Sequence, residues 1–289
     1  MQIIDLVQSS PTLFIIITLL LGLLVGSFLN VVIYRLPLMM EREWQQQCAE
    51  LNDLEIPETE PLTLSTPRSR CPKCGHAITA VENIPIISYL VLAGKCKQCK
   101  TLISKRYPII EALTALLSGI IAWQFGFEWS CLGALLLTWA LIALTFIDVD
   151  HQLLPDSITL PLLWLGISFN LFSTYTDLQA SVIGAIAGYL SLWLVFHGFK
   201  LATGKEGMGY GDFKLLAALG AWLGWAFLPS IILLSSLVGA AVGIILIVIG
   251  QHQRNIPIPF GPYLAAAGWI ALVWGTEINT AYLELAGLN

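Results

Sequence analysis

Charged side chains are scarce in this chain of 289 residues: Asp, Glu, Lys and Arg make up 11% of it, and hydrophobic residues make up 56%. Soluble domains carry about 25% charged residues, so the composition excludes an ordinary soluble protein. No Lys or Arg precedes Arg35. The chain therefore lacks the basic start of a cleavable signal peptide, and we expect its first apolar run to be kept. We expect no nucleic-acid partner.

Apolar segments of spanning length, or close to it, recur about eight times. They cover residues 12–34, 108–126, 130–147, 156–174, 179–199, 212–226, 229–250 and 260–276. A helix needs about 20 residues to cross a bilayer. Continuous apolar character favours helices over a barrel. The sequence thus predicts an all-α polytopic membrane protein with about eight transmembrane helices.

The basic residues give an independent check on this topology. Of the fourteen Lys and Arg residues, ten lie between the first and second segments, three in or beside the loop before the sixth, and one between the seventh and eighth. With eight spans, all of them fall on one side of the membrane. Because basic loops stay in the cytoplasm, we expect the large loop inside the cell and both termini in the periplasm.

We divide the chain into a first transmembrane helix (residues 1–34), a cytoplasmic loop (residues 35–107) and a transmembrane helical core (residues 108–289). The loop holds two C-x-x-C knuckles about twenty residues apart, a spacing typical of a structural zinc ribbon. We therefore predict Zn²⁺ on Cys71, Cys74, Cys96 and Cys99. The alternative, a pair of disulfides, is disfavoured by a reducing cytoplasm. A closed four-thiolate site has no position for water, so this zinc is expected to be structural.

Two stretches, one rich in acidic residues and one rich in glycine, lie at the cytoplasmic ends of predicted spans. The run DVDHQLLPD covers residues 148–156, and GMGYGD covers residues 207–212. An ionisable group at a membrane boundary is costly and is by default a functional-site hypothesis. Asp148 and Asp212 are the candidates for a pair, although Asp212 and Asp156 each also fit a helix N-cap. The sequence does not decide whether the side chains meet.

These motifs together resemble the bifunctional type IV prepilin peptidases, which are inner-membrane aspartyl proteases of bacteria. The resemblance covers nearly the whole chain. It rests on GSFLN at residues 26–30, YRLP at 34–37, both cysteine knuckles, the run at 148–156, GMGYGDFK at 207–214 and PIPFGP at 257–262.

The resemblance implies that Asp148 and Asp212 are catalytic and that the four knuckle cysteines hold zinc. It implies that type IV prepilins and type II pseudopilins are cut after a Gly that precedes an apolar segment. The new N-terminal residue is then methylated from S-adenosylmethionine. No Rossmann-type glycine motif is present for this donor. Glu82 and Lys95, polar residues inside the loop, are the candidates for binding it.

Two other classes of protein remain as alternatives. A proton-coupled transporter also carries Asp in its spans, but usually near the bilayer midplane and often with inverted repeats. The acids here lie at one boundary, and no convincing repeat is visible. A non-enzymatic scaffold would use the zinc ribbon to bind a partner.

Overall fold

The computed structural model describes residues 2–54, 61–205, 207–249 and 259–285. These residues form helices and loops, with two isolated β-bridges and no named strand among them. The chain divides into two compact units, Met1–Phe127 and Glu128–Asn289. The predicted all-α class is confirmed.

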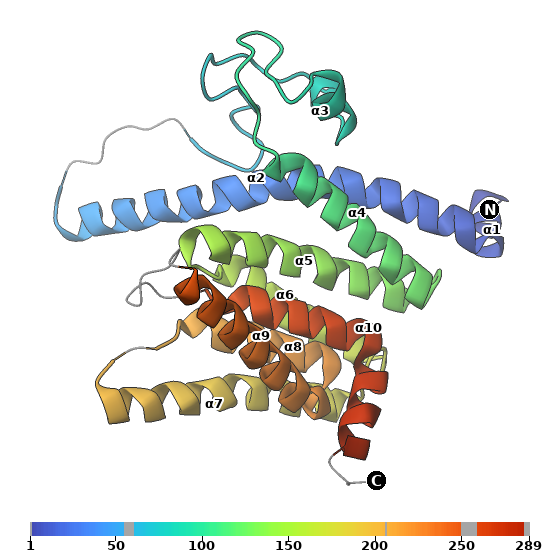
Figure 1. The fold of residues 1–289 in the computed structure, drawn as a ribbon, viewed down its shortest axis with the longest axis vertical. Coiled ribbons are helices and arrows are strands. Elements are labelled where there is room, and N and C mark those ends of the chain that lie inside the picture. Colours follow the sequence, from blue (N-terminus) through green and yellow to red (C-terminus); the bar gives the residue numbers. More distant parts are fainter. Residues whose placement is uncertain (1, 55–60, 206, 250–258, 286–289) are drawn as a thin grey trace. The chain divides into compact units, whose positions relative to one another are not determined.

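The first unit holds two long helices and the cysteine-bearing insert (Figure 1). Its elements are α1 (Gln2–Ser9), α2 (Pro11–Leu51), η1 (Val81–Asn83), α3 (Ile87–Val91) and α4 (Arg106–Phe125). Two glycines let α2 approach α4 closely. A Cβ at Gly22 would lie 2.7 Å from the Cα of Ala115, and a Cβ at Gly26 would lie 2.8 Å from the Cα of Glu111. Small residues at such contacts are typical of helix pairs in membranes.

Helix α2 is much longer than the span predicted within it. The helix has 41 residues, which at about 1.5 Å per residue is roughly 60 Å, about twice the thickness of a bilayer core. The predicted span ends at residue 34, and the helix continues to Leu51, first through the apolar residues 36–40 and then through the mostly exposed residues 41–51. Its second half therefore extends beyond the apolar stretch.

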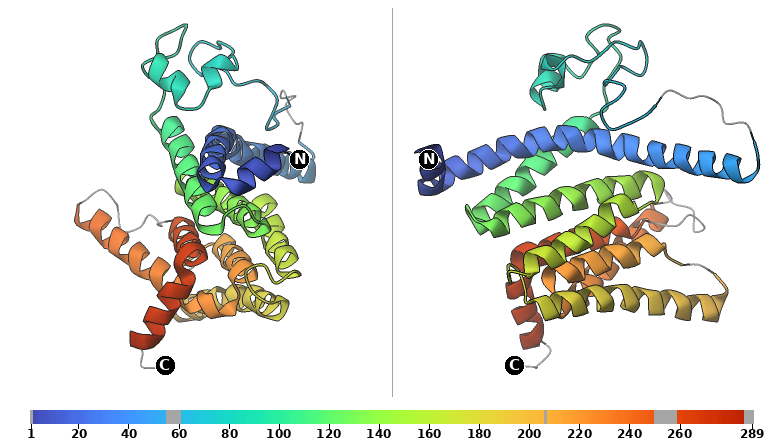
Figure 2. Two further views of the ribbon diagram at one scale, coloured as in Figure 1. Left: turned by 90° about the vertical axis from the view of Figure 1, so that its right-hand side faces the viewer. Right: turned by 180° about the vertical axis from the view of Figure 1, so that it is seen from behind.

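The second unit is a bundle arranged around α8 (Figure 2). Its elements are α5 (Trp129–His151), α6 (Asp156–Asn170), α7 (Leu178–Thr203), α8 (Tyr210–Leu223), η2 (Trp225–Phe227), α9 (Leu228–Val248) and α10 (Gly261–Leu285). Residues 215–223 of α8 are all buried, because α6, α7 and α10 pack around them. The side chain of Asn170 donates hydrogen bonds to the carbonyls of Ala221 and Trp222, at 2.9 and 3.0 Å. These bonds satisfy carbonyls that the end of a helix leaves open.

All eight predicted apolar segments are helical in the described residues. Five helical stretches are long and apolar enough to cross a membrane: Pro11–Leu51, Arg106–Phe125, Trp129–His151, Leu178–Thr203 and Trp225–Leu246. Helices α6 and α8 have 15 and 14 residues, which is shorter than a full span of about 20. The number of crossings and the three domain boundaries stay predictions.

Candidate active site and metal site

Asp148 lies in the last turn of α5 and is buried. The helix ends at His151, where Gln152 adopts a left-handed conformation and donates its N–H to the carbonyl of Asp148 at 2.9 Å. The carboxylate Oδ2 accepts a hydrogen bond from the backbone N–H of Gly261 at 3.0 Å. Gly261 is the first residue of α10, so Asp148 satisfies a donor that the start of this helix leaves open.

Asp212 lies in the first turn of α8 and is buried to a similar degree. Gly209 is the N-cap of this helix, and no side chain caps it. Asp212 therefore does not act as the N-cap itself, an alternative that its position before the apolar segment had left open. Its carboxylate is held at a helix start, where the helix dipole favours negative charge.

The structure brings Asp148 and Asp212 together although 64 positions separate them in the chain. Each acid lies beside the same leucine, Leu154. The side chain of Leu154 lies between the two helix starts. A Cβ at Gly211 would lie 2.7 Å from the Cβ of Leu154, and a Cβ at Gly261 would lie 3.1 Å from its Cδ2. The two glycines thus make room for one leucine between the backbones that carry or contact the acids.

The other acids of the same stretch are arranged differently. Asp150 is exposed. Asp156 begins α6, where its two carboxylate oxygens accept hydrogen bonds from the Nζ of Lys214, each at 2.7 Å. This ion pair joins the start of α6 to α8, and the predicted N-cap role of Asp156 does not appear, because Pro155 occupies the cap position. Asp148 and Asp212 are consequently the acids of this region that are both buried and mutually close.

The four cysteines of the insert lie together as the sequence predicts. Their sulfur atoms are all within 4.8 Å of one another. The Sγ atoms of Cys71 and Cys99 are 3.8 Å apart, and those of Cys74 and Cys96 are 4.0 Å apart. A tetrahedral Zn²⁺ with Zn–S bonds of about 2.3 Å needs sulfurs about 3.8 Å apart. The thiols therefore fit a four-thiolate metal site, and no disulfide joins them.

The two knuckles share one backbone design. The N–H of Gly75 bonds to the carbonyl of Cys71 at 2.9 Å, and the N–H of Lys100 bonds to that of Cys96 at 3.0 Å. Both turn residues have positive φ, +72° for Gly75 and +57° for Lys100. Gly adopts this conformation freely, whereas Lys does so at a cost. Each turn directs two thiols toward the same point.

Hydrogen bonds already favour the thiolate form at part of this site. Bonds from the side chain and the backbone N–H of Thr101 lower the pKa of Cys99 to about 6. For Cys74, the backbone N–H of His76 acts in the same direction, but desolvation and the neighbouring thiols together raise its pKa to about 11. A bound cation supplies the remaining stabilisation that four adjacent thiolates need.

Glu82 connects the two knuckles. Its Oε2 accepts a hydrogen bond from the N–H of Thr79 at 3.0 Å and lies 3.2 Å from the Nε2 of His76, while its Oε1 lies 3.2 Å from the Nζ of Lys97. The bond from Thr79, followed by the contacts with Lys97 and His76, lowers the pKa of Glu82 to about 2. Lys95 is exposed, and its backbone pairs with Leu102. The role of Glu82 and Lys95 in binding a methyl donor stays a prediction.

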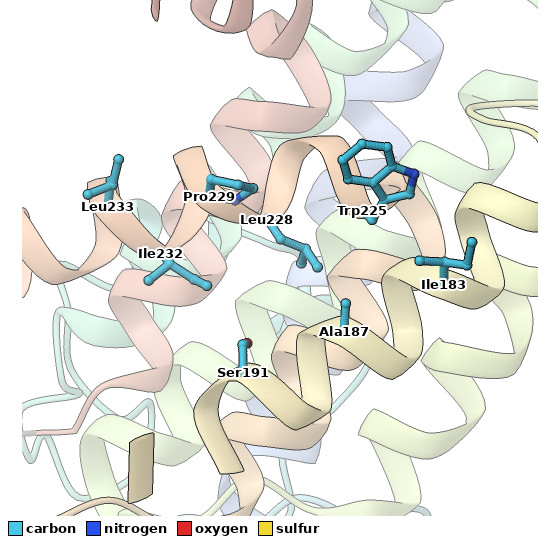
Figure 3. A pocket seen from close by; sticks show the side chains of 8 residues that line it. All are labelled: Ile183, Ala187, Ser191, Trp225, Leu228, Pro229, Ile232 and Leu233. Carbon is cyan, nitrogen blue, oxygen red and sulfur yellow. The ribbon is translucent and has the colours of Figure 1, made fainter. Parts of the chain in front are cut away.

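An apolar pocket of about 460 Å³ lies between α7 and the start of α9 (Figure 3). Its lining is Ile183, Ala187, Ser191, Trp225, Leu228, Pro229, Ile232 and Leu233. None of the candidate catalytic or metal-binding residues lines it. With one hydroxyl among apolar side chains, it offers no group for acid–base chemistry.

Comparison with known proteins identifies the family to which the chain belongs. Residues 20–125 match the model of the bacterial peptidase A24 N-terminal domain, and residues 135–244 match that of the type IV leader peptidase family. A prepilin leader peptidase/N-methyltransferase of Pseudomonas aeruginosa is 58% identical over 291 residues, covering 100% of both chains. The chain belongs to the type IV leader peptidase family.

Other members of the family are similarly alike. A protein with the same name from Neisseria gonorrhoeae is 56% identical, and the match covers 86% of this chain and 87% of that protein. One from Legionella pneumophila is 47% identical, and the match covers 96% of this chain and 97% of that protein. The matched N-terminal region contains the four knuckle cysteines, and the matched peptidase region contains Asp148 and Asp212. No solved structure matches the chain.

Two contributors to the candidate site were not identified from the sequence. Gly261 and Leu154 lie inside two of the motifs listed above, PIPFGP at residues 257–262 and the run at residues 148–156, but neither residue stands out by its chemistry. The signal available was the run at residues 257–262, which is among the motifs that carry the family resemblance. Nothing in it indicates that the N–H of Gly261 meets Asp148.

Proposed function

We propose that the protein is a membrane-embedded aspartyl endopeptidase that removes the leader from type IV prepilins and type II pseudopilins and then methylates the new N-terminus with S-adenosylmethionine. Its relatives over the full chain carry the name prepilin leader peptidase/N-methyltransferase. The observation that carries the chemistry is the pair of buried carboxyl groups, Asp148 at the end of α5 and Asp212 at the start of α8, on either side of Leu154. Nothing in the comparisons favours the transporter alternative.

The pair suits a water-mediated cleavage without a covalent enzyme intermediate. Two carboxyl groups this close hold one proton between them, because both do not ionise readily side by side. The ionised member takes a proton from a water molecule, which attacks the scissile carbonyl carbon. The protonated member donates its proton to the carbonyl oxygen. The hydrogen bond from Gly261 stabilises a negative charge on Asp148, and the helix start stabilises one on Asp212. Either acid can therefore be the ionised member, and we assign the roles of base and acid to the pair as a whole.

We propose that the protein lies in the bacterial inner membrane with both acids and the insert on the cytoplasmic side and both termini in the periplasm. The one-sided distribution of Lys and Arg supports this orientation. The ion pair between Asp156 and Lys214 keeps the start of α6 beside α8, the helix that carries Asp212. A membrane-anchored substrate would then be cut at the boundary where its apolar segment begins.

We propose Zn²⁺ as the metal of the insert, held by Cys71, Cys74, Cys96 and Cys99, since the sulfur separations fit its tetrahedral bond length. Bound there, the ion supplies structural cross-linking. For the methyl donor we propose the insert, with Glu82 and Lys95 as candidates. The carboxylate of Glu82 is already engaged by Thr79, His76 and Lys97. Because these contacts already occupy its carboxylate, Glu82 alone is not free to bind S-adenosylmethionine. We assign no chemical step to Glu82.

The experiment is a cleavage assay on a full-length prepilin in detergent or nanodiscs, read by N-terminal mass analysis with and without S-adenosylmethionine. Asp148→Asn and Asp212→Asn should each abolish cleavage while keeping the insert's metal. The matched control is Asp150→Asn, an exposed acid of the same stretch. Substantial turnover by either buried-acid variant, with a folded protein, excludes the pair as the catalytic centre. A wild-type product that gains no methyl group excludes the second activity.

A further inference from the structure

The short helix α3 turns its apolar side outward. Ile87, Leu90 and Val91 lie at helix positions i, i+3 and i+4, which form one face, and they are 59%, 69% and 78% exposed. The inward side carries Tyr89, whose hydroxyl donates to the carbonyl of Ile103 at 3.5 Å. A helix on the surface of a soluble domain shows the opposite pattern, with polar residues outside. The exposed face of α3 therefore suits an apolar environment.

The anchoring of α3 fixes the depth at which this face lies. The backbone N–H of Ile86, just before the helix, donates a hydrogen bond to the Oε2 of Glu111 in α4 at 2.8 Å. Glu111 is buried and packs against Gly26 of α2. Gly26 lies eight residues before the end of the apolar segment 12–34, which is about 12 Å along the helix. The start of α3 is thus level with the membrane-spanning part of α2.

The irregular backbone before α3 has hydrogen-bond partners. Ile86 has a φ of +58°, which is uncommon for a β-branched residue. Irregular backbone at membrane depth is tolerated where protein groups satisfy it. Glu111 satisfies the N–H of Ile86, and the amide of Asn30 donates to the carbonyl of Tyr107 at 3.2 Å. The first bond holds the turn before α3 against α4, and the second holds the start of α4 against α2.

The charges that follow α3 complement an anionic lipid surface. No acidic residue occurs from Asn83 to Ile110, whereas five basic residues do: Lys95, Lys97, Lys100, Lys105 and Arg106. Basic residues beside an apolar face are typical of elements that lie in the headgroup region of anionic bilayers. In water, the apolar face of α3 would stay exposed without an apolar contact, which is unfavourable.

We propose that α3 is an interfacial membrane anchor, whose face of Ile87, Leu90 and Val91 inserts among the acyl chains of the leaflet on the insert's side. The cysteine knuckles are then held at the membrane surface. Lys95, Lys100, Lys105 and Arg106 lie on the lipid headgroups, whereas Lys97 is paired with Glu82. This inference rests on the contacts within the first unit and does not depend on the assignment of the catalytic acids. Its partner is the bilayer itself, not a second protein.

The test uses the full-length protein in nanodiscs of phosphatidylethanolamine and phosphatidylglycerol. An environment-sensitive fluorescent amino acid replaces Leu90 in one preparation and Ser65, an exposed polar position of the same insert, in the control. Lipids brominated on their acyl chains then serve as quenchers. Retained insert metal shows that each preparation is folded. If the Leu90 preparation loses its metal, Val91 takes the probe.

We expect blue-shifted emission at Leu90 that loses intensity with brominated lipid, and red-shifted, unquenched emission at Ser65. Red-shifted, unquenched emission at Leu90 means that water surrounds the face and overturns the proposal. Blue-shifted emission that brominated lipid does not quench means that protein covers the face, which also overturns it. Equal quenching at both positions would show that α3 contacts lipid no more than the rest of the insert does, and it also overturns the proposal.

Discussion

Adding one methyl group at Gly261 should disable cleavage without unfolding the protein. The Cβ of an alanine there would lie 2.6 Å from the Oδ2 of Asp148 and 3.1 Å from the Cδ2 of Leu154. Ordinary van der Waals contact begins at 3.4 Å, so the Asp148 oxygen has to move by about 0.8 Å. The carboxylate lies at the end of α5 between packed helices, and it has little room to move without losing its bond to Gly261.

The size of the effect follows from this displacement. Misplacing a reacting group by about 1 Å costs roughly a hundredfold in rate, which corresponds to about 2.7 kcal/mol of transition-state stabilisation. We therefore expect Gly261→Ala to lower the rate of leader cleavage by about two orders of magnitude. Metal content should stay unchanged, because the cysteines lie in the other compact unit.

The assay is the initial rate of leader removal from a prepilin in nanodiscs, with thermal unfolding measured in parallel. Gly198→Ala is the matched control, since a Cβ at Gly198 in α7 meets nothing within 4 Å. The control should cleave at the wild-type rate. If Gly261→Ala keeps a rate within about threefold of wild type, a shift of this carboxylate does not matter for the rate, and the proposed role of Asp148 is wrong.

Three further predictions concern the groups around the two sites. Glu82→Gln should speed release of the insert's metal to a chelator, because Glu82 contacts groups of both knuckles. The control is Glu43→Gln, on the exposed part of α2, and equal release rates for the two variants would show that Glu82 does not link the knuckles. The pKa of Glu82 is lowered to about 2, so its stabilising contribution is complete above its unfolded value of about 4.3 and is lost only as the pH falls through about 2. The difference between these two variants should therefore stay constant from about pH 5 to pH 8, and a step in that range contradicts the assignment. Asp156→Asn should keep most of the cleavage activity, because an exposed ion pair such as that with Lys214 contributes only about 0.2–1 kcal/mol; loss of activity as complete as in the Asp148 variant would mean that Asp156 takes part in the reaction.

Sequence reasoning worked best where local pattern determines structure. Apolar runs of spanning length predict helices, and each of the eight runs is helical in the described residues. The cysteine spacing predicted the cluster, because two tight turns with fixed backbone hydrogen bonds bring the thiols together. The one-sided charges put Asp148 and Asp212 at the same membrane boundary, which made their proximity possible to predict.

The remaining features depend on contacts between distant segments, which hydropathy does not encode. The bond from Gly261 to Asp148 exists because α10 starts where α5 ends in space, 113 positions along the chain. The continuation of α2 to Leu51 was missed because its second half is polar. A polar segment forms a helix as readily as an apolar one when its residues have helix propensity. The outward apolar face of α3 became visible only once its contacts were known.

The position of Leu154 has a consequence for the spacing of the two candidate acids. Its aliphatic side chain fills the space between the helix starts at Gly211 and Gly261, so its size limits how closely these two backbones approach. A smaller residue would let the two helix starts come closer together, and a larger one would hold them further apart. If the proposed function holds, the room for the attacking water depends on a residue that has no reactive group of its own.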